Sequence, residues 1–276
     1  MTINCNGYLL DLSVPKIAGI LNITPDSFYD GGKYISEDAI KNRTKELIEE
    51  GADIIDIGAF SSRPGAELIS ESEETIRLQS TLEIVRKYFP NIILSVDTYR
   101  SEIARFVIKE FEVSIINDIS GGDYDNKMFE TIAEFQVPYI VMHMQGNPGT
   151  MQTKPQYIDV VKDLLKYFSE KTETAKKIGI NDLIIDPGFG FGKTLEHNYQ
   201  LLNNLDLFKI SERPILVGLS RKSMIYKLNN ETPEDALPGT LALNMIALQK
   251  GANILRVHDV EETLQVINVF NKLISS

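Results

Sequence analysis

Short runs of aliphatic and β-branched residues recur along the chain, and a polar residue ends or interrupts each of them. Segments of helix length, apolar on one face, separate most of these runs. The eight runs are residues 17–21 before Asn22, 54–57 around Asp56, 92–96 before Asp97, 114–116 before Asn117, 139–142 before His143, 183–185 before Asp186, 215–219 before Ser220 and 254–257 before His258. This alternation predicts eight parallel strands closed into an α/β (β/α)₈ TIM barrel with its helices outside.

The polar residues stand at the carboxyl ends of the predicted strands. In a parallel barrel these ends meet at one mouth, and barrel enzymes carry their active sites there. We therefore expect the side chains that follow the strands to form a single site.

The length of the chain, 276 residues, suits one barrel, and no shift in composition marks a second unit. We expect a single domain over residues 1–276. Residues 7–12 precede the first barrel run and predict a short strand or hairpin that closes the bottom of the barrel.

Capping residues mark several helix ends. Gly51 and Gly251 each follow an amphipathic segment, where a helix C-terminal glycine belongs. Ser70 and Glu73 match a capping box, and Ser101 is expected to cap the helix after the third strand.

Composition narrows the class of protein. The chain is 43% hydrophobic and 24% charged, as in an ordinary globular protein. Its net charge of −11 and pI near 4.9 argue against a nucleic-acid surface. Its sequence predicts neither a signal peptide nor a membrane span, and the single cysteine, Cys5, cannot form an internal disulfide. We expect a cytoplasmic protein.

Two early loops carry candidate chemistry. Residues 22–32 (NITPDSFYDGG) contain Pro25, Gly31 and Gly32, which predict no regular structure, and the loop is expected to close over a substrate. Residues 58–66 (GAFSSRPGA) offer hydroxyls, backbone amides and the guanidinium of Arg63, the donors that a phosphate needs.

Residues 186–192 (DPGFGFG) follow the sixth strand. Their glycines do not open a helix with dinucleotide spacing, so a flat heterocycle against backbone fits better than a dinucleotide. Phe191 is expected to face the ligand, whereas Phe189 fits the core and the ligand pocket equally well.

Positive charge gathers after the last two strands. Ser220, Lys222, Arg256 and His258 are expected to bind phosphate, and Arg256 and His258, two apart on a strand, project to the same side. Deeper in the barrel, three polar residues would suit a ring with several N–H donors. Buried carboxylates without partners are costly, so a ligand or a lysine such as Lys222 must satisfy them. These three residues are Asp97, Asn117 and Asp186.

Other chemistries lack their patterns. The three histidines and the single cysteine have no zinc-ligand spacing, and no G-x-S-x-G elbow supports a serine hydrolase. His143 is expected to be a satisfied strand-end histidine and His197 to face solvent, so neither is given a role.

Seven motifs taken together resemble those of the bacterial dihydropteroate synthases, pterin-binding barrels, and they span nearly the whole chain in one order. They are GILNITPDSFYDGG (19–32), SSRPGA (61–66), SVDTY (95–99), NDISGG (117–122), DPGFGFGK (186–193), GLSRK (218–222) and RVHDV (256–260). The resemblance implies a transferase that condenses dihydropterin pyrophosphate with p-aminobenzoate, as a homodimer with Mg²⁺.

The resemblance also implies residue roles. Asn22 would ligate Mg²⁺ with the substrate pyrophosphate, and Asp97, Lys222 and Arg63 would be catalytic. The pterin would be bound by Asp97, Asn117, Asp186 and Lys222; the diphosphate by Arg63, Arg256 and His258; and the p-aminobenzoate by Ser62, Pro64, Phe28, Phe191, Ser220 and Lys222.

Three residues depart from the family pattern, which commonly has Ser, Glu and Thr where this chain has Tyr29, Phe60 and Ser62. Ser62 keeps a hydroxyl, whereas Tyr29 and Phe60 add aromatic bulk near the expected p-aminobenzoate side. The departures bear on arylamine affinity and on the response to sulfonamides.

Three alternatives remain open from sequence. A methyltetrahydrofolate-binding methyltransferase barrel would not need both early loops, and a non-catalytic pterin-binding paralogue would be expected to lose cations that are present here, such as Arg63 or Lys222. An aldolase or isomerase barrel would usually show a Schiff-base lysine on a strand, and Lys222 lies just past one.

Overall fold

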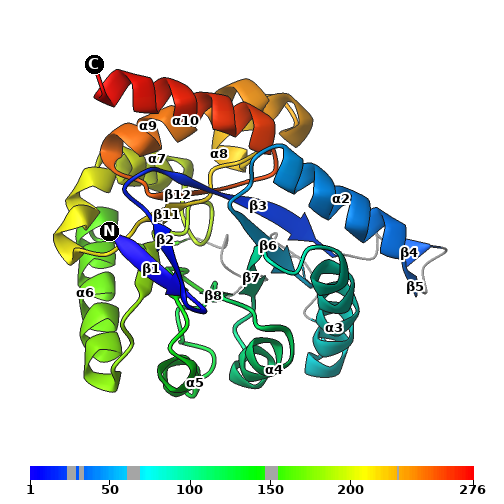
Figure 1. Ribbon diagram of the computed structural model, residues 1–276. Coiled ribbons are helices and arrows are strands. Elements are labelled where there is room, and N and C mark those ends of the chain that lie inside the picture. Colours follow the sequence, from blue (N-terminus) through cyan, green and yellow to red (C-terminus); the bar gives the residue numbers. More distant parts are fainter. Residues whose placement is uncertain (24–28, 31–33, 61–68, 147–154, 229) are drawn as a thin grey trace.

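The computed structural model describes residues 1–23, 29–30, 34–60, 69–146, 155–228 and 230–276, and it contains the expected barrel (Figure 1). Eight parallel strands form one sheet in the order β10-β9-β8-β7-β6-β3-β12-β11. A further parallel bridge between Ile185 and Ile215 joins the two ends of this order, so the sheet closes on itself. The strands are β3 (Lys16–Asn22), β6 (Ile54–Gly58), β7 (Ile93–Asp97), β8 (Ile115–Asp118), β9 (Tyr139–Met142), β10 (Leu183–Asp186), β11 (Leu216–Val217) and β12 (Ile254–Val257).

Helices surround the sheet, and Figure 1 shows α2 to α6 and α9 and α10 on its outside. Their bounds are α2 (Glu37–Glu49), α3 (Glu71–Tyr88), α4 (Ser101–Phe111), α5 (Met128–Phe135), α6 (Val160–Ile178), α7 (Leu195–Asn203), α8 (Ser223–Tyr226), α9 (Leu237–Lys250) and α10 (Val260–Ile274), with short 3₁₀ helices η1 (Leu205–Ser211) and η2 (Pro233–Ala236). Among the described residues, no helix is long and apolar enough to cross a membrane.

The helix ends confirm most of the expected caps. Gly251 is the left-handed C-cap of α9, with φ of +105°, a conformation that glycine adopts without steric cost. Ser70 Oγ accepts a hydrogen bond from the Glu73 amide at 3.2 Å, although the Glu73 carboxylate binds Arg77. The prediction for Ser101 is wrong: it is the first helical residue, and the Asp125 carboxylate, from another segment, accepts from its amide at 2.8 Å.

The expected N-terminal hairpin is present and begins earlier than predicted. Strands β1 (Thr2–Cys5) and β2 (Tyr8–Asp11) pair antiparallel and lie across the end of the barrel that faces the viewer in Figure 1. Their buried side chains, among them Ile3 and Leu10, pack against residues near the amino ends of the barrel strands, among them Ile54 and Ile184. The hairpin therefore closes the bottom of the barrel and leaves the other mouth for a site.

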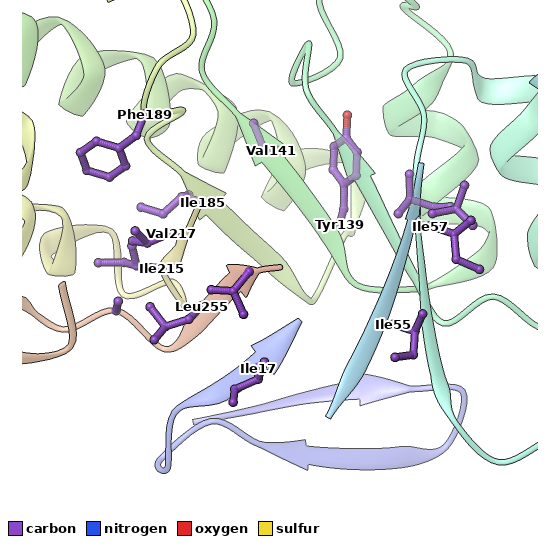
Figure 2. Packing of buried hydrophobic residues seen from close by; sticks show 14 of the residues in the cluster. Ile17, Ile55, Ile57, Tyr139, Val141, Ile185, Phe189, Ile215, Val217 and Leu255 are labelled. Carbon is purple, nitrogen blue, oxygen red and sulfur yellow. The ribbon is translucent and has the colours of Figure 1, made fainter. Parts of the chain in front are cut away.

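Alternation along the strands places most of the buried apolar residues in two clusters. Figure 2 shows Ile55, Ile57, Val141, Ile185 and Leu255 in the larger cluster, which lies between the sheet and the helices. The neighbouring positions on the same strands face the barrel interior. Ile54 and Ile254 pack there with the hairpin, and the next inward positions on these two strands, two residues further along, are Asp56 and Arg256.

The first loop holds more regular structure than expected. Strands β4 (Tyr29–Asp30) and β5 (Tyr34–Ile35) pair antiparallel. The prediction that residues 22–32 lack regular structure is therefore wrong at Tyr29–Asp30, because these two residues pair with Tyr34 and Ile35, which lie outside the loop.

Candidate active site

Polar residues on neighbouring strands lie side by side at the open mouth of the barrel. The parallel register pairs Asn22 with Gly58, Gly58 with Asp97, and Asp97 with Asn117. A Cβ at Gly58 would lie 3.4 Å from Asn22 Oδ1 and 3.8 Å from Asp97 Cβ, so glycine leaves a space between these two side chains. The expected convergence of strand-end residues is present.

Asp97 is a buried carboxylate with one unused oxygen. It is 4% exposed, and among the described residues its Oδ1 has no hydrogen-bond partner. Burial raises the pKa of Asp97 to about 7, aided by the carboxylates of Asp56, Asp118 and Asp186 and opposed by Arg256. An unsatisfied buried acceptor is costly, so Oδ1 is suited to an N–H donor from a bound molecule.

Arg256 is held by carboxylates rather than presented freely to an anion. Its Nε donates to Asp56 Oδ2 at 2.6 Å, and its Nη2 lies 3.6 Å from Asp97 Oδ2. Burial alone would lower the pKa of Arg256, but the two carboxylates outweigh burial and raise it. The role of Arg256 in binding a diphosphate stays a prediction. In the structure, Arg256 neutralises the buried carboxylates of Asp56 and Asp97.

Asp186 and Lys222 form the opposite side of the site. Asp186 Oδ1 accepts from the Gly188 amide at 2.7 Å, and burial raises the pKa of Asp186 against the opposing charge of Lys222. Lys222 donates to the carbonyl of Phe189, and its Nζ lies 4.7 Å from the centre of the Phe191 ring. Burial lowers the pKa of Lys222 to about 8. Lys222 thus serves the carboxylate electrostatically, as expected, while its hydrogen bond goes to the glycine-rich loop.

The two phenylalanines of this loop differ in environment. Phe189 is fully buried in the main core. Of the two environments that the sequence allowed for it, core and ligand pocket, the structure shows the core. Phe191 stays partly exposed and packs beside a small cluster that contains Phe60 and Met142. The aromatic bulk of Phe60 therefore lies on the Phe191 side of the site, as its position in the second loop suggested.

Lys193 is a buried cation that sequence reasoning missed. Its Nζ lies 3.0–3.1 Å from four acceptors, namely the carbonyl oxygens of His143, Gly188 and Phe191 and the ring Nδ1 of His143. Burial lowers the pKa of Lys193 to about 7, and burial with the nearby lysine lowers the pKa of His143 to about 2. His143 is a satisfied neutral histidine, as expected, and the lysine that ends the DPGFGFGK motif was the available signal.

Replacement of Lys193 by Met is expected to destabilise the protein by about 3 kcal/mol or more, because carbonyl groups of Gly188 and Phe191 would lose their buried donor. Denaturant unfolding measures the change, and the exposed Lys176→Met is the control, expected to stay within about 0.5 kcal/mol of the parent. Equal unfolding midpoints for the two variants would contradict this account of Lys193.

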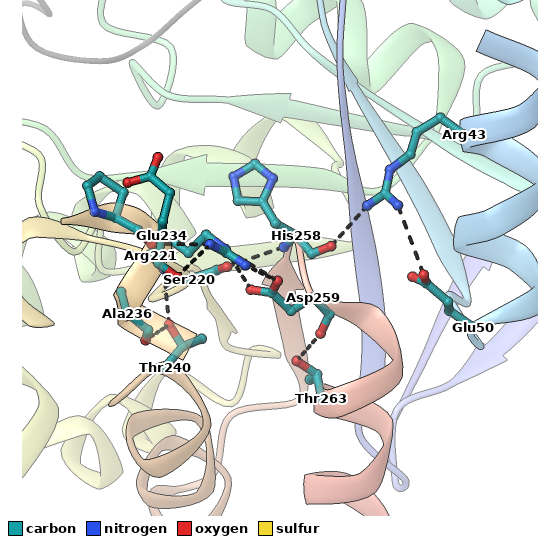
Figure 3. A network of polar contacts seen from close by, with 11 residues as sticks. Arg43, Glu50, Ser220, Arg221, Glu234, Ala236, Thr240, His258, Asp259 and Thr263 are labelled. Carbon is teal, nitrogen blue, oxygen red and sulfur yellow. Dashed lines mark hydrogen bonds and ion pairs between the residues drawn. The ribbon is translucent and has the colours of Figure 1, made fainter. Parts of the chain in front are cut away.

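A second network joins the loop after β11 to the end of β12 (Figure 3). Arg221 has φ of +54°, rare for a residue with a Cβ, and its guanidinium donates to both oxygens of Asp259, at 2.6 Å from Nη2 and 3.0 Å from Nε. Ser220 Oγ accepts from the His258 amide at 3.3 Å, and Arg43 donates to the His258 carbonyl at 3.0 Å. These contacts place Ser220 and His258 together at the mouth.

Of the remaining residues named from the sequence, His197 is described by the structure and four are not. His197 is half-buried rather than solvent-facing: its Nδ1 accepts from the Thr194 amide at 3.3 Å in a capping box, and its ring meets Tyr157 edge-on. Four predicted substrate-binding residues lie outside the described residues: Phe28, Ser62, Arg63 and Pro64.

Comparisons with known proteins agree with this arrangement. Residues 18–258 match the family described as pterin binding enzyme. The dihydropteroate synthase of Haemophilus influenzae is 44% identical over 98% of this chain and 98% of its own.

Solved structures show the same likeness. A Yersinia pestis dihydropteroate synthase in complex with a sulfonamide drug is 40% identical with a TM-score of 0.93, over 100% of both chains. A Xanthomonas albilineans dihydropteroate synthase in complex with 7,8-dihydropteroate is 34% identical with a TM-score of 0.86, also over 100% of both chains. The chain therefore belongs to the dihydropteroate synthases of the pterin-binding enzyme family.

Proposed function

We propose that this protein condenses 6-hydroxymethyl-7,8-dihydropterin pyrophosphate with p-aminobenzoate to give 7,8-dihydropteroate and pyrophosphate. The protein is a transferase, and its relatives over the full chain are dihydropteroate synthases. The observation that carries the proposal is the pair of buried carboxylates, Asp97 and Asp186, facing one mouth of a barrel whose other end is closed.

Three acceptors suit the donor-rich edge of a pterin. Asp97 offers Oδ1, which no described residue engages, Asp186 offers Oδ2, and Asn117 can offer its amide oxygen. The ammonium of Lys222, beside Asp186, supplies a donor for the ring carbonyl. An apolar ligand would leave these groups unsatisfied, so the site selects a polar ring.

The reaction breaks the bond between the pterin methylene carbon and the diphosphate oxygen, and the bonding electrons leave with the diphosphate. The arylamine nitrogen then forms a bond to the same carbon and loses a proton. The positive charge that develops on the ring is stabilised by Asp97 and Asp186 in a water-poor site. An arylamine is unprotonated near neutral pH, so the step requires no strong general base.

The diphosphate would be bound at the rim by Ser220, His258 and Arg63, with Arg256 contributing charge from below. We propose that Mg²⁺ binds with it, using Asn22 Oδ1 at the space beside Gly58. The described residues contain no cluster of three His, Cys, Asp or Glu side chains suited to a metal, which fits an ion held chiefly by substrate oxygens and water. When bound, Mg²⁺ would neutralise charge on the leaving diphosphate.

The arylamine would lie between the Phe191 side of the site and the two early loops. Phe191 is partly exposed and Lys222 lies over its ring. An aromatic side chain and a cation for the carboxylate of p-aminobenzoate therefore lie side by side. Phe28, Ser62 and Pro64 would complete this pocket when the loops close over bound diphosphate. Closure would exclude water, which competes with the arylamine as nucleophile.

We also propose a homodimer that uses α9 and α10. Ile246 of α9 is 39% exposed, and Val269 and Leu273 of α10 are 60% and 57% exposed. Packing of these helices on the barrel therefore leaves apolar surface uncovered. Sedimentation of the parent protein and of a Val269→Glu variant tests the proposal, which fails if both are monomers.

A cytoplasmic location is supported by Cys5, a free and buried thiol. Fractionation of cells that express the protein tests this location. Recovery with the membrane or secreted fraction would refute it.

Incubation of the purified protein with the pterin pyrophosphate, p-aminobenzoate and Mg²⁺ tests the function directly. We expect dihydropteroate and pyrophosphate at equal rates, and strong loss of activity on chelation. Release of pyrophosphate without dihydropteroate would refute the synthase and favour a hydrolytic role.

The pH dependence of kcat/KM for the pterin substrate is expected to be bell-shaped. Burial raises the pKa of Asp97 to about 7, so below this pH the carboxylate is protonated and cannot stabilise the ring cation. Burial lowers the pKa of Lys222 to about 8, so above this pH the ammonium is lost. Activity should fall about tenfold per pH unit on each side, with apparent limits that belong to the whole cluster. A flat profile across both limits would contradict these roles.

A further inference from the structure

The carboxylate of Asp56 lies directly beneath the proposed pterin site. Asp56 is the middle residue of β6, faces inward above Ile54 of the apolar floor, and is 1% exposed. Both of its carboxylate oxygens already accept hydrogen bonds from neighbouring side chains. Any effect of Asp56 on a bound ligand is therefore exerted through the residues that it binds.

Three donors converge on Asp56. Its Oδ1 accepts from Ser95 Oγ at 2.6 Å, and its Oδ2 accepts from Arg256 Nε at 2.6 Å and from Asn117 Nδ2 at 3.4 Å. Two of these donors, Arg256 and Asn117, belong to residues of the proposed substrate site. A single buried carboxylate thus fixes both.

The contact with Asn117 has a chemical consequence. The Asp56 carboxylate pairs with the Arg256 guanidinium and accepts hydrogen bonds from its neighbours, so the Asn117 amide turns its NH₂ group toward Asp56. Asn117 Oδ1 then points away from Asp56 and can face the ligand as an acceptor. Without the acceptor below, the amide could equally well present its NH₂ group, which would repel a ring edge made of N–H donors.

We infer that Asp56 is a positioning residue that makes the pocket selective for pterins, by orienting the Asn117 amide as an acceptor and fixing the guanidinium of Arg256. The inference rests on the proposed function, because it takes a pterin as the ligand. Asp56 carries no role in the reaction itself. Its effect is on which ring binds.

The experiment compares the binding of two rings by calorimetry. One is 6-hydroxymethyl-7,8-dihydropterin, and the other carries oxygen in place of its 2-amino group and so lacks that donor. The parent protein should prefer the pterin by at least about tenfold, the value of one hydrogen bond of about 1.4 kcal/mol. A ratio of affinities does not depend on the fraction of folded protein.

Two substitutions at Asp56 separate orientation from charge. Asp56→Leu fills the same space without an acceptor, and we expect the preference to fall about tenfold, by loss of the Asn117 contact. Asp56→Asn can keep an oxygen toward Arg256 and Asn117 while its NH₂ group donates to Ser95 Oγ, so the preference should stay within about threefold of the parent.

Asp118→Asn is the matched control. Asp118 is a buried carboxylate at the end of β8, and its donors are the Ser120 amide and hydroxyl, the Gly122 amide and the Tyr139 hydroxyl, none of which is a proposed substrate contact. Its replacement can lower stability but should leave the ratio of affinities unchanged. A general loss of order in the core would instead change the ratio in both Asp56→Leu and Asp118→Asn.

The outcomes are distinguishable. No preference in the parent protein would refute the proposed function, whereas an unchanged preference in Asp56→Leu would overturn only the role of Asp56. An equal loss in Asp56→Leu and Asp56→Asn would assign the effect to charge and overturn the orientation argument. If Asp56→Leu does not fold, Asp56→Ala replaces it, and failure of both to fold would make Asp56 a folding residue and overturn the inference.

Discussion

Replacement of Asp97 by Asn is expected to lower kcat/KM by about 10²- to 10³-fold, the usual cost of losing one preorganised electrostatic contact to a transition state. The substitution keeps the shape of the side chain and removes its negative charge. The described residues leave one buried oxygen of Asp97 unpaired at the mouth, so Asp97 is the described carboxylate best placed to meet the positive charge on the ring.

Steady-state kinetics with both substrates measures this loss, and kcat should fall more than KM rises because the charge develops only in the transition state. Asp118→Asn serves again as the control, since that carboxylate binds Tyr139 and Ser120 and acts on Asp97 only through its charge; its loss should lower the pKa of Asp97 without lowering kcat. A variant at Asp97 that kept near-parent kcat would show that the ring cation is stabilised elsewhere.

Replacement of Lys222 by Met is expected to lower kcat/KM by about 10²-fold, or about 2.7 kcal/mol. The ammonium opposes the effect of burial on the pKa of Asp186, so its removal would raise that pKa further and weaken the carboxylate as an acceptor for the pterin. It would also free the Phe189 carbonyl, which accepts from Lys222. Unlike the Asp97 variant, this one should show a clear rise in KM for the pterin.

Kinetics of the exposed Lys227→Met variant gives the control for loss of a surface charge, expected to be near the parent. A Lys222→Met enzyme with unchanged KM for the pterin would contradict the pairing of Lys222 with Asp186. Loss of arylamine binding alone would confine the role of Lys222 to the p-aminobenzoate pocket.

Local patterns in the sequence were sufficient for the barrel. Each strand run alternates inward and outward positions, and the two apolar clusters follow that alternation residue by residue, as Ile54 and Ile55 illustrate. Caps set by neighbours in sequence, such as Gly251 and Ser70, were also predictable. Ser101 was not, because its amide is satisfied by Asp125 from a distant segment.

The strand-end residues of the candidate site could be predicted from the sequence, whereas most of their hydrogen-bond partners could not. Asp97, Asn117 and Asp186 were identified because a parallel barrel must gather its strand ends at one mouth. Arg256 was expected to face an anion, yet it binds Asp56, whose position inside an apolar run was visible without indicating a partner. Lys193 stood at the end of a recognised motif, but nothing local indicated that it would lie beneath four acceptors.

The sequence by itself determined the strand and helix periodicity, the closed parallel sheet and the set of polar residues at its mouth. These follow from interactions between near neighbours and from burial of one face of each element. The tertiary structure alone decided which carboxylate neutralises Arg256, which way the Asn117 amide turns, and which lysine anchors the glycine-rich loop. Those choices depend on distances between strands far apart in sequence, where burial makes every charge and every unpaired polar atom costly enough to select its partner.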